Sequence, residues 1–125
     1  MPRKYFTVEE ADALLPALTE LLQKMLAARQ HIIDTRKTWE PIIEKAGSNG
    51  GGAHGKQLYR DTDRIHLTLE QLTDWGILIK DVDTGLVDLP HLRDGREVFL
   101  CWRLGESQVS YWHEVDAGFT GRKPL

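Results

Sequence analysis

The sequence has one cysteine among its 125 residues and no apolar run near the length of a membrane span. A single cysteine cannot form an internal disulfide, so packing has to stabilise the fold. A membrane-spanning helix needs roughly 18 or more consecutive apolar residues, and we therefore predict no membrane insertion. Basic residues are not in excess either, because 16 Lys and Arg stand against 19 Asp and Glu. Without the strongly basic surface that duplexes need, we predict no binding to nucleic acid.

Length and composition are those of an ordinary globular chain. A chain of 14.3 kDa with 41% hydrophobic residues can bury a core as a single domain, residues 1–125. The N-terminal residues hold no apolar leader segment, which predicts a cytoplasmic protein. Cys101 stands in the apolar run VFLCW and is expected to be a buried small side chain rather than a nucleophile. We predict no cofactor, and we assign no metal ligands.

The N-terminal third carries the pattern of a long amphipathic helix. Thr7 can cap this helix, and Glu10, three residues later, can complete a capping box. Apolar residues then recur with alternating spacings of three and four, the pattern of a coiled coil. They are Ala11, Leu14, Leu18, Leu21, Met25, Ala28, Ile32 and Trp39. We predict one helix over about residues 8–46.

A glycine-rich stretch over residues 47–55 interrupts this pattern and predicts a loop. It does not have the order of a phosphate-binding loop, because Gly55 and Lys56 are followed by Gln57 and a helix precedes them. A second helix is expected over about residues 56–75, ended by Gly76. The two helices should pack as a long antiparallel hairpin.

The unequal lengths of the two helices predict self-association. At 1.5 Å per residue the first helix measures roughly 55–60 Å and the second about 30 Å, so the second should cover only part of the apolar stripe. The uncovered part is expected to be Leu14, Leu18, Leu21 and Met25. The C-terminal segment, a second copy of the chain, or both can cover it. We predict a two-fold symmetric homodimer formed through the long helices.

After Gly76 the apolar period changes from helical to about two, which predicts short strands. The runs cover residues 77–81, 86–89, 97–104 and 109–115. The third run is apolar on both faces and should be central, whereas Pro90 excludes a central position for the end of the second. The predicted fold class is α+β: a long antiparallel helical hairpin followed by a small antiparallel β-meander over residues 77–115, with a C-terminal turn and tail over residues 116–125.

The C-terminal stretch concentrates aromatic and ionisable side chains. The candidate ligand-binding residues are Trp112, His113, Glu114, Asp116 and Arg122. Strand alternation ends near Val115, and Gly118 and Gly121 allow the backbone to fold back. This return should bring Arg122 toward the acidic pair or toward a ligand acid, since guanidinium suits a bidentate contact with carboxylate or phosphate. We expect the four ionisable side chains of this set to converge on one side of Trp112.

Two classes of function remain open. The first is a non-enzymatic binding or assembly module, dimeric through its long helices, whose C-terminal stretch receives a small anionic ligand or a partner peptide. The alternative is a small hydrolase, with or without a metal, in which His113 is the base or a metal ligand and Glu114 or Asp116 orients it. The same side chains can also be structural, closing the core against the first helix. No catalytic signature fits the stretch, so we assign no activity.

Four stretches carry a family resemblance: YFTVEEADALLP (5–16), GLVDLP (85–90), DGREVFLCWRLGE (94–106) and YWHEVDAGFTGRKPL (111–125). In order and spacing the chain resembles the prokaryotic proteins grouped as domain of unknown function family 2203. The resemblance covers the whole chain and implies a complete cytoplasmic domain. It implies no chemistry, because the family has no assigned activity or catalytic residues.

Overall fold

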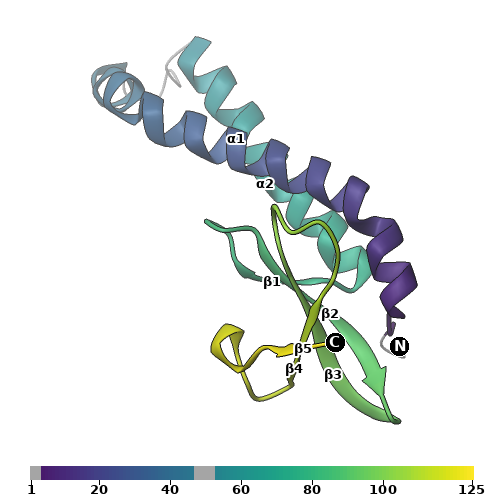
Figure 1. Cartoon of the computed structure of the whole chain (residues 1–125). Helices are drawn as coiled ribbons and strands as arrows, with labels where there is room; N and C mark the ends of the chain where they lie inside the picture. Colours follow the sequence, from purple (N-terminus) through teal and green to yellow (C-terminus); the bar gives the residue numbers. More distant parts are fainter. Residues whose placement is uncertain (1–3, 47–52) are drawn as a thin grey trace.

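The computed structural model describes residues 4–46 and 53–125. Two helices, α1 (Val8–Ala46) and α2 (Ala53–Trp75), come first and form a long hairpin (Figure 1). The strands follow as β1 (Leu78–Asp81), β2 (Leu86–Arg93), β3 (Arg96–Arg103), β4 (Tyr111–Glu114) and β5 (Lys123–Pro124), with the short 3-10 helix η2 (Phe119–Gly121) before β5. They form one antiparallel sheet in the order β1-β2-β3-β4-β5. The predicted α+β class is confirmed.

Local chemistry fixes both ends of the helical hairpin. At the start of α1, the Thr7 hydroxyl accepts the Glu10 amide at 3.0 Å, and the Glu10 carboxylate accepts the Thr7 amide at 2.9 Å. This is the predicted capping box. The hydrogen bond from the Thr7 amide lowers the pKa of the Glu10 carboxyl below its ordinary 4.5. At the end of α2, Gly76 has φ +82° and the Ile77 amide bonds the Leu72 carbonyl at 2.9 Å, which stops the helix as predicted.

The register of the hairpin corrects the prediction of an uncovered N-terminal half. His31 of α1 lies 2.5 Å from Asp61 of α2, so the end of α2 reaches the first turns of α1, where Trp75 and Leu14 line one hollow. The helices are therefore offset along their length, with α2 shifted toward the N-terminal end of α1. Leu18 and Met25 are fully buried within a single chain, in the cluster that also contains residues of the sheet, so for them the C-terminal segment supplies the expected cover.

The buried side of α1 is also rotated from the predicted stripe. Its buried residues include Ala11, Leu15, Leu18, Leu22, Met25 and Ala28. Leu14 and Leu21 are only half-buried. The heptad pattern therefore located the helix but misplaced its buried face by about one residue, because both α2 and the sheet pack against α1 and the buried face is broader than a two-helix seam.

One prediction concerns the connection between the helices. The loop was expected over residues 47–55, but α2 already begins at Ala53, and residues 47–52 lie outside the described part of the chain. Neither helix, within the described residues, combines the length and the apolar character that crossing a membrane requires.

The sheet confirms the central position of the third strand. β3 pairs with β2 and with β4, and every residue from Val98 to Trp102 is buried. β2 is longer than predicted, extending through Pro90 to Arg93. The β1 partners end at Asp88, and the Pro90 carbonyl accepts the Phe6 amide at 2.7 Å from the chain before α1. Pro90 thus lies where β2 has no second strand beside it, as its missing amide requires.

The sheet has two unlike faces. The face toward the helices carries the main core, with Val87, Leu89, Val98, Leu100, Trp102 and Trp112 packed with the apolar side of α1 and with α2. We call the opposite one the outer face. Because strand residues alternate, Asp88, Phe99, Cys101 and His113 belong to the outer face, yet all four are buried. The C-terminal tail, including η2 and the unpredicted β5, pairs along the edge of β4 (Figure 1).

Candidate functional site

The four ionisable side chains expected to converge do not do so. His113 and Glu114 are neighbours in β4, so alternation sends them to opposite faces of the sheet. Glu114 accepts a 2.6 Å hydrogen bond from Arg96, and Asp116 is exposed beyond the strand. Arg122 forms its ion pair with a different carboxylate, described below. The predicted convergence is therefore wrong, and ligand binding by these residues stays a prediction.

Trp112 also faces away from His113. It lies on the helix-facing side of the sheet and belongs to the core cluster, with a side chain that is 7% exposed. Arg93 and Lys123 lie over its ring, at 4.4 and 4.9 Å from the ring centroid. Its buried indole nitrogen has no hydrogen-bond partner among the described residues.

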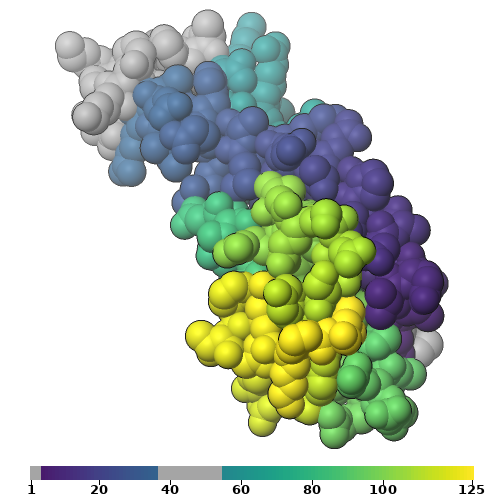
Figure 2. Space-filling model, in the orientation of Figure 1, coloured from purple at the N-terminus to yellow at the C-terminus, as the bar shows by residue number. Residues whose placement is uncertain are grey.

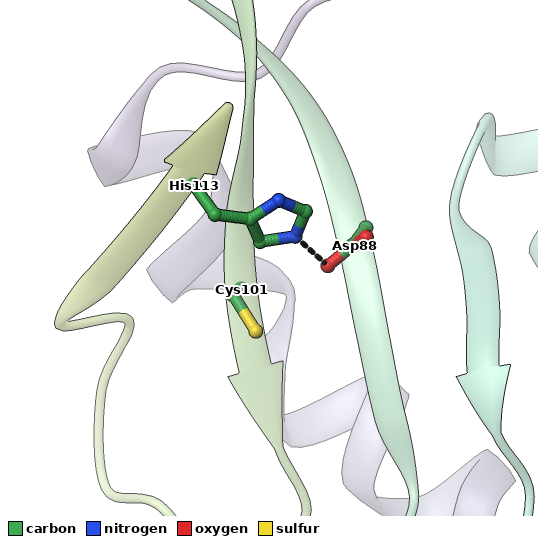
Figure 3. Close-up of side chains that lie close together, drawn as sticks. All are labelled: Asp88, Cys101 and His113. Atoms are coloured by element: carbon green, nitrogen blue, oxygen red, sulfur yellow. Dashed lines mark hydrogen bonds and ion pairs between the residues drawn. The ribbon is translucent and has the colours of Figure 1, made fainter. Parts of the chain in front are cut away.

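His113 instead belongs to a buried cluster on the outer face. Figure 3 shows His113 from β4 and Asp88 from β2 pointing toward each other, with Cys101 from β3 beside them. The register places Asp88 directly opposite Cys101, and His113 opposite Phe99, which lies two residues from Cys101 on the same face of β3. One ligand-type atom of each of the three lies within 4.8 Å of the others, and the residues are only 1–2% exposed. Three adjacent strands thus hold a carboxylate, a thiol and an imidazole together.

The hydrogen bonds of His113 constrain where protons lie. Its Nδ1 faces the Glu114 carbonyl oxygen at 2.7 Å, and a carbonyl only accepts, so Nδ1 carries a hydrogen. Its Nε2 faces Asp88 Oδ1 at 2.9 Å. A neutral imidazole protonated at Nδ1 presents a lone pair to that carboxylate oxygen. Either a proton or a cation must therefore lie between Nε2 and Oδ1.

Of the other two members of the cluster, Asp88 lacks one hydrogen-bond partner and Cys101 is unreactive. Asp88 Oδ2 is buried and has no hydrogen-bond partner among the described residues. Burial raises the pKa of the Cys101 thiol to about 11, so at neutral pH it is protonated and a poor nucleophile. Both ring nitrogens of His113 are engaged elsewhere, so neither is free to accept the thiol proton as a base. The cluster does not have the arrangement of a cysteine–histidine nucleophile.

Arg122 fastens the C-terminal tail beside this cluster. Its Nη2 donates to both carboxylate oxygens of Glu106, at 2.8 and 3.0 Å, and approaches the Cys101 carbonyl at 3.3 Å. The guanidinium lies over Tyr111 at 4.1 Å and Phe119 at 4.7 Å. Figure 2 shows the C-terminal residues continuous with the surface of the strands. Arg122 thus makes a structural clamp, in which one guanidinium nitrogen is shared between the two carboxylate oxygens of Glu106 of its own chain.

A second candidate surface runs along the exposed side of the hairpin. One hollow of about 440 Å³ is lined by Ala13, Leu14 and Trp75 among others. Another of about 280 Å³ is lined by Ala17, Leu21 and again Trp75. Because Trp75 lines both, the hollows follow one another in the groove between α1 and α2. Neither is lined by the residues of the buried cluster.

Sequence reasoning selected His113 but missed its partners. The sequence held no clear signal for Asp88, because alternation with Val87 and Leu89 is the ordinary pattern of an outward-facing polar residue, whereas the structure buries Asp88 beside a partner. Identifying that partner required the register of three strands. Cys101 was correctly predicted to be buried, but its neighbours could not be read from the sequence.

These features define a small α+β protein, with a helical hairpin on one face of an antiparallel sheet and a buried polar cluster on the other. Residues 4–125 match the model of a family described as Uncharacterized conserved protein (DUF2203). The chain belongs to this family, which confirms the resemblance found in its sequence. No curated protein and no solved structure matches it.

Proposed function

We propose that the protein is a non-enzymatic assembly module that forms a homodimer through the exposed side of its helical hairpin. The observation that carries the proposal is the outer stripe of α1, which we define as Glu10, Ala13, Leu14, Ala17, Leu21 and Lys24. Its apolar members are small or half-buried in the single chain. They line the groove shared with Trp75. The proposed surface thus keeps Leu14 and Leu21 of the stripe expected from helix length, whereas Leu18 and Met25 are buried within the chain.

Charge favours a second copy of the same chain as the occupant. Glu10 and Lys24 each lie seven residues from Ala17, one before it and one after it. When two copies of α1 cross antiparallel on a two-fold axis at Ala17, Glu10 of each copy faces Lys24 of the other. An isologous interface requires this kind of self-complementarity. Alanine at the crossing also allows close approach of the two helices.

Cross-linking at the proposed axis tests the interface. In an Ala17→Cys variant the two new thiols are expected to lie within reach of each other and to form a disulfide-linked dimer under mild oxidation. Gln23→Cys is the matched control, because Gln23 is equally exposed but lies outside the outer stripe. Equal cross-linking of the two variants, or none in either, would contradict the proposed axis.

The ligand surface of this module is proposed at the C-terminal stretch, around Trp112. Support comes from Arg93 and Lys123, whose cationic groups both lie over its ring, a setting suited to a small anion or an acidic peptide. Inorganic phosphate is the probe. It should raise the melting temperature of the wild type and have less effect on Lys123→Ala, whereas Lys80→Ala, at the other end of the sheet, should respond like the wild type. No shift in the wild type would exclude this surface.

The hydrolase alternative has less support. His113 is 2% exposed and bonds Glu114 only at its backbone carbonyl, since the Glu114 carboxylate lies on the opposite face of the sheet, while Asp116 is exposed beyond the strand. A general base needs access to the proton it removes, and neither hydrogen-bonded nitrogen of His113 has this access. We therefore favour binding and assembly over catalysis.

A further inference from the structure

We propose that Asp88, Cys101 and His113 form a binding site for a divalent transition metal ion, with zinc as the best fit. The site is independent of the proposed dimer, because it lies on the outer face of the sheet and not on the hairpin. Three observations carry it: the closeness of the three donor atoms, the geometry of His113, and the unpartnered oxygen of Asp88.

The donor set matches zinc in kind and in spacing. Thiolate, imidazole and carboxylate are the ligands that zinc takes in proteins, at about 2.0–2.3 Å. Around a tetrahedral ion such ligands are separated by about 3.3–3.8 Å. The three donor atoms here lie within 4.8 Å of one another, with Nε2 and Oδ1 at 2.9 Å. Small side-chain rotations are enough to fit the ion, and the three protein ligands leave one position for a further ligand.

His113 is oriented as a metal ligand. Its Nδ1 hydrogen is donated to the Glu114 carbonyl at 2.7 Å, which leaves Nε2, facing Asp88 Oδ1 at 2.9 Å, as the nitrogen that an ion can take. Metal-bound histidines are characteristically held in this way, with the second nitrogen donating to a backbone carbonyl or a carboxylate. An ion at Nε2 removes the conflict between the Nε2 lone pair and Asp88 Oδ1.

The Asp88 carboxylate supplies the independent indication of a missing partner. Its side chain is 2% exposed, and Oδ2 has no hydrogen bond among the described residues. A buried, unpaired carboxylate oxygen is costly. A divalent ion satisfies it by coordination. Binding exchanges the ion for the thiol proton of Cys101 and for the proton held between His113 and Asp88, and both protons leave to solvent.

The ion is proposed to enter while the chain folds, since the finished cluster is buried. The experiment therefore supplies metal during refolding. Protein unfolded with a chelator, refolded with zinc and desalted should retain one zinc per chain by elemental analysis. Refolding with cobalt should give the charge-transfer absorption of a cobalt–thiolate bond, which a site built from surface histidines cannot produce because Cys101 is the only thiol.

Two variants separate this site from adventitious binding. Cys101→Ser keeps the shape of the side chain and is expected to weaken zinc binding at least about tenfold, since even outer-shell changes cost about 10–100-fold. His66→Ala removes an exposed histidine paired with Glu70 and should bind as the wild type does. If Cys101→Ser does not fold, the cobalt spectrum of the wild type decides. The proposal would be overturned if the refolded wild type retained no zinc, if its cobalt form lacked the thiolate band, or if Cys101→Ser bound zinc as well as the wild type. The cluster would then be a proton shared between His113 and Asp88.

Discussion

At the residue scale, two arginine–glutamate pairs of this protein differ in their surroundings. Arg122 is largely buried, bonds both oxygens of Glu106 and lies over two aromatic rings. Arg96 meets Glu114 with a single contact, and its side chain is 62% exposed. Solvent screens the second pair. Removing Arg122 takes away the charged partner of the partly buried Glu106, which keeps only the Arg103 amide among the described residues, and the cation over Tyr111.

Alanine substitutions should therefore separate the two arginines. We expect Arg122→Ala to lower the free energy of unfolding by about 2–3 kcal/mol and Arg96→Ala by less than about 1 kcal/mol. Arg122→Lys should recover little, because lysine lacks the planar guanidinium that lies over Tyr111 and Phe119. Urea unfolding of the three variants measures this. Equal losses for the two alanine variants would contradict the clamp.

Cys101 should be chemically silent in the folded protein. Its thiol is 1% exposed and has a pKa of about 11, so at pH 8 it is both inaccessible and protonated. Alkylation by iodoacetamide, followed by mass spectrometry in the presence of a chelator, should proceed only through unfolding and become rapid in denaturant. Rapid alkylation of the native chain would show that the outer face is open.

Some features of single residues could be predicted from the sequence and others could not. The burial of Cys101 followed from its apolar neighbours, and the capping box of Thr7 and Glu10 depends only on local spacing. The partners of His113 depend on strand register, which sets contacts between residues 25 positions apart. No local pattern contains that information, so the expected convergence around Trp112 failed while the choice of His113 as a site residue stays open.

At the element scale, helix ends and turns were the most predictable features. Their glycines differ in how much stability a substitution is expected to cost. Gly76 has φ +82° but space for a Cβ atom, whereas Gly85 has φ +67° and a Cβ there would lie 2.7 Å from Leu104 Cβ. Gly118 has an ordinary φ of −113° and open space around it. Left-handed backbone costs a non-glycine residue about 1–2 kcal/mol, and a clash adds to this.

We expect alanine at these three positions to destabilise the protein in a fixed order. Gly85→Ala should cost the most, Gly76→Ala about 1–2 kcal/mol, and Gly118→Ala close to nothing. Thermal unfolding followed by circular dichroism measures the order. A Gly118→Ala loss as large as that of Gly76→Ala would contradict the assigned backbone conformations.

The capping box makes the start of α1 sensitive to acid. The folded-state pKa of Glu10 lies below 4.5, so the unfolded chain takes up the proton first as the pH falls. Stability from the ionised Glu10 is thus present above about pH 4.5 and lost as the pH falls through the lowered value. Glu10→Gln keeps a hydrogen-bond acceptor without the charge. The melting temperatures of wild type and Glu10→Gln should converge at low pH, and a constant difference from pH 7 to pH 3 would contradict this account.

The strands were harder to predict than the helices. Helical period fixed α1 and α2 to within a few residues, because each turn repeats the same signal. The two residues of β5 carry no such repeat and form a strand only because Tyr111 and Trp112 of β4 offer an edge. β2 was cut short at Pro90 because a proline normally ends pairing, although here its missing amide lies on the open side of the strand.

At the scale of the whole molecule, the helical hairpin and the sheet bury one core while the exposed groove of the hairpin remains. The unequal helix lengths do not by themselves require a dimer, because α2 and the sheet cover Leu18 and Met25 within one chain. What supports self-association is the outer stripe, with apolar residues at its centre and opposite charges at its two ends. The central claim is therefore that this groove joins two copies of the chain.

Light scattering coupled to size exclusion tests that claim most directly. At tens of micromolar protein, the wild type should have twice the 14.3 kDa mass of the chain. Ala17→Glu, which places like charges together at the proposed axis, should reduce the mass to that of one chain with little change in helix content. A wild-type mass of 14.3 kDa at this concentration, or a dimer unaffected by Ala17→Glu, would contradict the account.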